Sequence, residues 1–154
     1  MNINNLPRNI SIFPLSDVVF FPKTILPLNI IEKRYIQLVN DSMKDQRLFG
    51  MIQPKKGRRD QDVYEVGCLG KIINFNETSD GRFIINLSGI IRFRIVKELV
   101  SNKLYRKFSV DYSDFLQDLK IVKNNTKYNK KDFLKKIDIF FKKKNYLINI
   151  NELE

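Results

Sequence analysis

The sequence contains no histidine and only one cysteine, Cys68, among its 154 residues. The lack of histidine excludes Ser-His and Cys-His catalytic pairs and histidine metal sites. One thiol can neither form an internal disulfide nor supply the four ligands of a structural zinc ion. Cys68 has no neighbouring cation or helix start that would lower its pKa, so we interpret it as a small core residue. We predict a protein that is not an enzyme and that needs no metal or cofactor.

Long apolar runs are also missing. No stretch approaches the roughly 20 apolar residues that span a bilayer as a helix. The N-terminus lacks the basic segment and following apolar run of a signal peptide. Together with the single cysteine, these absences predict a cytoplasmic protein without stable membrane insertion. The length suits one ordinary domain with a core that requires no disulfide.

Positive charge, by contrast, is in excess, with a formal net charge of +11. Clustered Lys and Arg side chains favour nucleic acid or an anionic membrane as partner. The chain is also rich in Asn and Ile, a bias that codon composition produces without selection for binding. The lysines concentrate between Lys120 and Lys144, so the excess charge belongs mostly to the C-terminal part. RNA binding therefore stays open as an alternative function.

Short apolar runs with close turns predict a mainly β domain with α-helix (α+β), formed by residues 1–118. About six strands and one early helix indicate an antiparallel barrel or pseudo-barrel rather than βαβ units. Asp80-Gly81 predicts a hairpin, because Gly81 tolerates the positive φ of such a turn. Two prolines make the first run typical of an edge strand. The expected strands are Asn5–Leu15, Arg47–Gln53, Gly67–Phe75, Arg82–Leu87, Ile91–Ile95 and Tyr105–Tyr112.

Two helices are expected. Asn29 and Glu32 have the spacing of a capping box before an apolar stripe that ends near Met43. The second helix runs from about Lys130 to Lys144 and is capped by Asn129. Residues 119–154 would thus form a linker and a basic amphipathic helix, the start of a helical extension. The apolar side of that helix is expected to pack on the barrel; an anionic membrane or a partner helix is the alternative.

Several ordered motifs resemble one known family. The segment SIFPLSDVVFFPKTILPLNIIEKR, residues 11–34, combines Phe-Pro-Leu, Phe-Phe-Pro and Leu-Pro-Leu before the first helix. Further matching motifs are Arg47–Ile52, Tyr64–Gly70, Asp80–Arg82, Leu87–Gly89 and Arg92–Arg94. This pattern resembles the Lon protease N-terminal (LON substrate-binding) domain family, especially its stand-alone bacterial proteins. Lys23 departs from the glycine that usually follows Phe-Pro, and Ile31 and Lys33 replace the common Phe and Pro.

The resemblance implies a PUA-like pseudo-barrel that captures unfolded or specific polypeptides. Complete Lon proteases add an ATPase and a Ser-Lys peptidase, both of which this chain is expected to lack. The expected function is therefore non-catalytic polypeptide binding, with a protease or chaperone as the recipient of the bound chain.

An exposed apolar patch is the predicted binding site. Apolar patches of this kind mark interaction surfaces, although aromatic and Met side chains at these spacings also suit a core. The candidate patch residues are Phe20, Phe21, Tyr35, Met51 and Pro54, with Lys23 and Arg34 at the rim. For RNA, Arg92-Phe93-Arg94 and Tyr105–Phe108 offer cations beside aromatic rings, but strand alternation predicts that Phe93 points inward.

Overall fold

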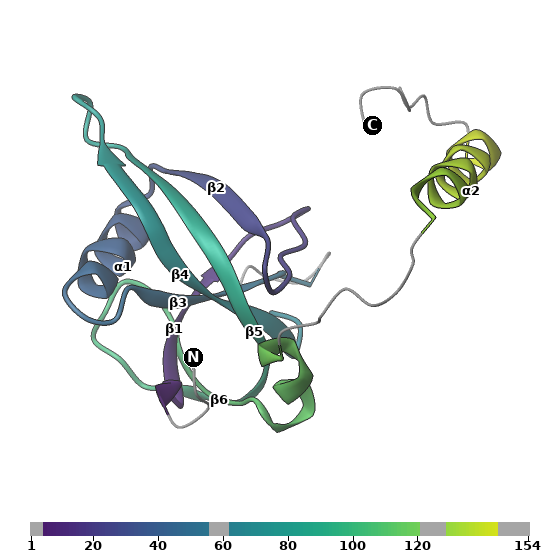
Figure 1. The fold of residues 1–154 in the computed structure, drawn as a ribbon. Helices are drawn as coiled ribbons and strands as arrows, with labels where there is room; N and C mark the ends of the chain where they lie inside the picture. Colours follow the sequence, from purple (N-terminus) through teal and green to yellow (C-terminus); the bar gives the residue numbers. More distant parts are fainter. Residues whose placement is uncertain (1–4, 56–61, 121–128, 145–154) are drawn as a thin grey trace. The chain divides into compact units, whose positions relative to one another are not determined.

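The computed structural model describes residues 5–55, 62–120 and 129–144 (Figure 1). The chain divides into two compact units, Met1–Lys120 and Ile121–Glu154. The first, called the sheet unit below, contains the strands, and the second, the helical unit, contains the C-terminal helix.

The sheet unit is a mixed sheet of six strands. They are β1 (Asn9–Pro14), β2 (Ile25–Ile30), β3 (Leu48–Ile52), β4 (Val66–Glu77), β5 (Phe83–Leu99) and β6 (Lys107–Asp111). Their hydrogen-bonded order is β2-β5-β4-β3-β1-β6, and β5 also pairs with β6. Five strands thereby close into a ring, and β2 extends the sheet from β5 (Figure 1). The predicted α+β class with about six strands is confirmed.

One strand pair departs from the predicted antiparallel arrangement. β1 runs parallel to β3, with Ile12 opposite Gly50, whereas the other named pairs are antiparallel. β1 also pairs with β6, so it is an interior strand and the prediction of an edge strand is wrong. Parallel neighbours need a long crossover, which β2 and the first helix supply here. Pro14 fits because it is the last residue of β1.

β4 and β5 form the predicted hairpin. Gly81 in its turn has a φ of 80°, as expected from the Asp-Gly signal. β5 continues through Gly89 as one strand of 17 residues, where two strands were predicted. The alternate side chains of Phe83, Ile85 and Leu87 are buried, as predicted from their shared face. The pairing with β4 changes register between Leu69 and Gly70 and between Ile72 and Asn74.

The first helix, α1 (Lys33–Met43), starts later than the capping signal predicts. Asn29 belongs to β2 and pairs with Ile84, so it is not the helix cap. Glu32 occupies the N-cap position without a side-chain cap bond, and the predicted capping box is therefore wrong. Asn29 cannot cap the helix because β2 stays paired with β5 up to Ile30. The apolar stripe of α1 is buried as predicted, at Tyr35, Leu38 and Val39.

Two clusters of buried side chains make up the core. One lies between α1 and the strands and includes the fully buried Phe49 and Leu38. The other centres on Phe93 and Leu69 and continues to the 3-10 helix η2 (Ser113–Leu119). Both clusters include residues of β1, β3, β4 and β5.

The helical unit contains α2 (Lys130–Lys143), close to the predicted bounds. Asn129 caps it as predicted, since its side-chain oxygen accepts hydrogen bonds from the backbone N–H groups of Lys131 and Asp132. Lys142 and Asp138 form an ion pair one turn apart, at 2.7 Å. The docking of its apolar side on the barrel stays a prediction. Within the described ranges, no helix has the length and apolar content needed to cross a membrane.

Candidate functional site

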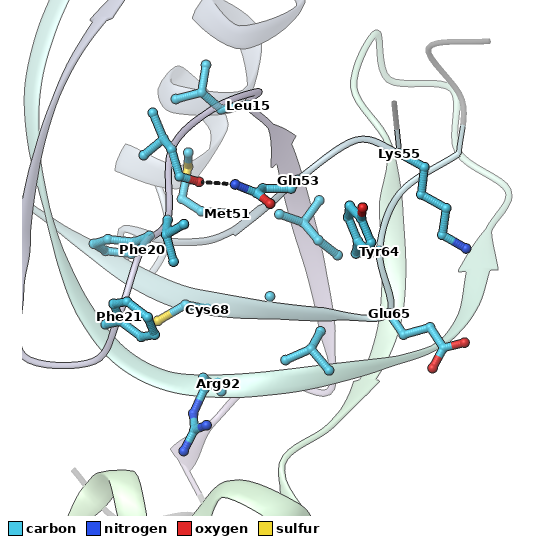
Figure 2. A pocket seen from close by; sticks show the side chains of 15 residues that line it. Leu15, Phe20, Phe21, Met51, Gln53, Lys55, Tyr64, Glu65, Cys68 and Arg92 are labelled. Atoms are coloured by element: carbon cyan, nitrogen blue, oxygen red, sulfur yellow. Dashed lines mark hydrogen bonds between the residues drawn. The ribbon is translucent and has the colours of Figure 1, made fainter. Parts of the chain in front are cut away.

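An apolar groove of about 570 Å³ opens on the sheet unit (Figure 2). Phe20 and Phe21 lie on one side of it, and Tyr64 lies on the other. The lining comes from the segment after β1, the end of β3, described residues between β3 and β4, the start of β4 and one residue of β5. The lining residues are Leu15, Val18, Val19, Phe20, Phe21, Met51, Ile52, Gln53, Lys55, Tyr64, Glu65, Val66, Gly67, Cys68 and Arg92.

The wall carrying Phe20 and Phe21 is an irregular segment, residues 18–21, that is fixed at both ends. At one end the Gln53 side-chain amide donates a 2.9 Å hydrogen bond to the backbone oxygen of Val18. Just beyond the other end, the Lys23 N–H donates to the Gly89 oxygen at 2.8 Å, and the Gly89 N–H donates to the Thr24 oxygen at 2.9 Å. These three hydrogen bonds hold the 18–21 segment against the sheet.

Two glycines of the sheet allow the 18–21 segment to lie close to it. A Cβ atom added at Gly89 would clash with the backbone oxygen of Phe21. A Cβ at Gly70 would lie 2.9 Å from the ring of Phe20 and 2.5 Å from Leu87. Both glycines are therefore required by close packing, and Gly89 is the stricter because backbone cannot move aside like a side chain.

The floor of the groove is apolar and chemically inert. Met51 and Cys68 are both buried there, and Gly67 adds no side chain. Burial raises the pKa of the Cys68 thiol to about 12, so the thiol stays protonated and unreactive near neutral pH. The interpretation of Cys68 as a small core residue is confirmed.

The rim of the groove, in contrast, exposes large apolar side chains. Val19 is 67% exposed and Phe21 is 54% exposed, and Tyr64 and Val66 are exposed on the opposite side. Exposed apolar groups gathered around one concavity mark an interaction surface more strongly than scattered ones do. A ligand that covers this rim would gain from removing apolar surface from water.

Arg92 lies at one edge of the groove, and its positive charge is balanced by the Asp118 carboxylate. Its guanidinium binds the Asp118 carboxylate through two contacts, of 2.9 Å and 2.8 Å, and the backbone N–H of Arg92 donates to the same carboxylate. The guanidinium also lies over the Phe115 ring, 4.7 Å from its centroid. Hydrogen bonding to Arg92 lowers the pKa of Asp118 below its ordinary value of 3.8. This pair ties η2 to β5.

We expect Asp118→Asn to destabilise the protein by about 1 kcal/mol at neutral pH, a value kept small because Arg92 is 41% exposed. Because the folded-state pKa of Asp118 is lowered, its contribution is present at neutral pH and is lost as pH falls through that lowered pKa. Urea unfolding from pH 7 to pH 3 should show the two proteins converging at the acid end. A difference in unfolding free energy between the two proteins that stays the same at every pH would contradict this role of the carboxylate.

Three of the predicted site residues line the groove, and the other four lie outside its lining. Phe20, Phe21 and Met51 come together in the groove. Tyr35 is buried in the core, where it stacks on Phe13 with ring centroids 4.1 Å apart. Tyr35 thus belongs to the packing of α1 rather than to the groove.

The remaining three candidates lie outside the groove lining. Arg34 is exposed, pairs with Glu32 at 2.7 Å and lies over the Tyr35 ring. The Lys23 ammonium donates a 2.7 Å hydrogen bond to the Lys120 backbone oxygen. Pro54 is half-buried and forms a bridge with Val63, next to the lining residue Gln53.

Other groove residues were not foreseen from the sequence. Val18 and Val19 directly precede Phe20, so the apolar run between Asp17 and Pro22 was a usable signal. No comparable signal identified the residues that reach the groove from distant segments. These are Ile52, Gln53, Lys55, Tyr64, Glu65, Val66, Gly67, Cys68 and Arg92.

The rings named for RNA binding do not form a stacking surface. Phe93, Tyr105 and Phe108 are all buried, and the inward direction predicted for Phe93 is confirmed. The neighbouring Arg94 contacts Asp114 at 3.1 Å, so its charge is balanced on the protein. RNA stacking needs exposed rings, which these residues do not offer. Across the ranges that the structure describes, no three Cys, Asp or Glu side chains gather as a metal site.

A ring-like mixed sheet of this kind is also found in solved Lon N-terminal domains. The chain is similar to a Lon N-terminal domain protein from Xanthomonas campestris, with a TM-score of 0.57 and 26% identity, over 68% of this chain and 59% of that one. The N-terminal domain of a Mycobacterium avium complex Lon protease shares the fold, with a TM-score of 0.56 and 9% identity, over 89% of this chain and 69% of that one. Residues 9–151 match the family model of the ATP-dependent protease La (LON) substrate-binding domain, and the chain belongs to this family.

Full-length relatives are much longer than this chain. Lon protease 2 of Myxococcus xanthus is 29% identical over 115 residues, which are 72% of this chain and 14% of the relative. Lon protease of Desulfosudis oleivorans is 35% identical over 96 residues, which are 59% of this chain and 12% of the relative. The similarity thus covers only a small part of each of those proteases.

Proposed function

We propose that this chain is a non-catalytic module that binds unfolded or specific polypeptides in the groove. The observation that carries the proposal is the exposed rim of Val19, Phe21, Tyr64 and Val66 around an apolar floor. Family membership supports a polypeptide as the ligand, since the family is described as a substrate-binding domain. Covering such a rim would contribute roughly 25 cal/mol for each Å² of apolar surface removed from water.

In this proposal, residues 1–118 are the binding domain, and residues 119–154 are a linker and a basic helix that begins a helical extension. The bound polypeptide passes to a protease or a chaperone in the cytoplasm. The free cysteine Cys68 agrees with that reducing compartment. RNA binding through the basic surface is the competing function, and the burial of Phe93 and Tyr105 gives it less support.

We expect Val19→Asp to weaken binding of a labelled, permanently unfolded polypeptide by about tenfold or more, because a carboxylate in the groove would be desolvated by the ligand. Val96→Asp is the matched control, since Val96 is 62% exposed on β5 and lies outside the groove lining. Fluorescence anisotropy of the labelled polypeptide would measure its affinity for both variants and for the wild type.

Equal binding by both variants would contradict the groove as the polypeptide site. Recovery of RNA from a lysate pull-down, removed by high salt, would favour the RNA-binding alternative instead.

A further inference from the structure

The C-terminal helix α2 has a distinct apolar side. Phe133, Ile137, Phe140 and Phe141 recur at spacings of three and four residues, which places them on one side of the helix. Within the helical unit, the Phe133 side chain is 47% exposed and the Phe140 side chain is 56% exposed. Leu134 is buried and adds nothing to this surface. Two phenylalanine rings are thus presented to solvent on a helix of 14 residues.

Lysines make up most of the opposite side of α2. Residues 130–144 contain seven lysines but only two aspartates, Asp132 and Asp138. Asp138 is already paired with Lys142 at 2.7 Å. Because the cations outnumber the acids, the helix complements a negatively charged partner. The lysines with exposed side chains are Lys131, Lys135, Lys136, Lys142, Lys143 and Lys144.

Local interactions favour the helical conformation of this segment. The Asn129 side chain caps the first turn, where Asp132 also lies, and Lys142 and Lys143 lie in the last turn. An acid near the start and cations near the end of a helix complement its dipole. So short a helix gains most of its stability when its apolar side is covered. A partner that covers Phe133 and Phe140 would therefore stabilise α2 as well.

We propose that α2 binds the surface of a membrane rich in anionic lipids, with its phenylalanines among the acyl chains and its lysines near the lipid headgroups. This inference goes beyond the proposed function, because it concerns the helical unit and does not depend on the groove. Helices with phenylalanine on one side and lysine on the other lie along membrane interfaces. Each lysine close to an anionic leaflet adds to the attraction. Since α2 is shorter than the roughly 20 residues of a membrane span, it lies along the surface.

Other partners would use only part of this surface. The phosphates of a nucleic acid would pair with the lysines but leave the apolar side of α2 in water. Packing on the barrel, as predicted from the sequence, would cover the phenylalanines but leave the lysines without a negatively charged partner. An anionic membrane serves both features at once.

Co-sedimentation of the full chain with lipid vesicles tests the proposal. One kind of vesicle contains phosphatidylcholine alone, and the other contains phosphatidylcholine with roughly one-third phosphatidylglycerol, which is anionic. The wild type should bind the anionic vesicles at least about tenfold more tightly than the neutral ones. High salt should weaken this binding, because it screens the attraction between lysines and headgroups.

Phe140→Asp and Ile139→Asp are a matched pair of variants for the apolar side. Both side chains are 56% exposed and both changes add one negative charge, but Ile139 points away from Phe133 and Ile137. Phe140→Asp should bind anionic vesicles about tenfold more weakly than Ile139→Asp. Phe140→Leu keeps an apolar side chain and should stay within about twofold of the wild type.

Circular dichroism of each variant measures whether its helix content is retained. If Phe140→Asp loses helix, the preference for anionic vesicles and the behaviour of Phe140→Leu still test the proposal. Equal binding of the wild type to both kinds of vesicle, or equal binding of the two aspartate variants, would overturn it. Failure to bind anionic vesicles, together with salt-sensitive binding of a labelled single-stranded RNA, would overturn it and assign the lysines to nucleic acid.

Discussion

Replacing Gly89 with alanine should release the 18–21 segment from β5 and reduce polypeptide binding by at least about tenfold. The new Cβ atom would overlap the backbone oxygen of Phe21, and the main-chain hydrogen bonds of Gly89 with Lys23 and Thr24, just beyond the segment, would be strained. Forcing backbone apart in this way typically costs about 1–3 kcal/mol of stability. Anisotropy and urea unfolding of the same preparation would measure both effects.

Gly81→Ala is the matched control for this change. Gly81 has open space around it but a φ of 80°, so alanine there is strained by its own backbone, at a cost of roughly 1–2 kcal/mol. Both variants are therefore destabilised to a similar degree, but only Gly89→Ala should lose binding. If the two variants bind equally well, the position of the 18–21 segment does not matter for the ligand.

Phe93→Ala should cause the largest loss of stability, about 3–5 kcal/mol. Phe93 is fully buried, and its ring fills the space above Gly50 and Gly67, where no side chain could replace it. The free energy of unfolding from urea titration would measure the loss. Ile84→Ala, at an exposed position of the same strand, should cost less than about 1 kcal/mol.

A small effect of Phe93→Ala would mean that the surrounding side chains collapse into the cavity. Because Phe93 does not itself line the groove, the same variant should still bind the unfolded polypeptide wherever it remains folded. Loss of binding by a fully folded variant would instead show that the groove depends on the core cluster behind it.

Local signals predicted the elements whose structure depends on neighbours in the sequence. Asp80-Gly81 located the β4–β5 hairpin, and the alternation of Phe83, Ile85 and Leu87 identified the buried face of β5. Asn129 located the start of α2. In each case the decisive interactions lie within a few residues, where turn chemistry and side-chain period act directly.

Local sequence signals gave the wrong prediction where a residue pairs with a partner far away in the sequence. Asn29 has the chemistry of a helix cap, but its pairing with Ile84 keeps it in a strand. The parallel pairing of β1 with β3 depends on a crossover that no local pattern specifies. For the candidate site, the Phe20-Phe21 wall could be predicted from its apolar run, whereas Tyr64 and Arg92 reach the groove only through the folded sheet.

The closing of the ring also has a consequence for biosynthesis. Asn9 of β1 pairs with Ser109 of β6, which is translated 100 residues later. During translation, β1 therefore cannot pair with β6 until those later residues have been made. Sheets that depend on such distant partners close slowly and leave apolar strands uncovered in the meantime. This chain would then expose, during its synthesis, apolar strands of the kind that we propose it binds once folded.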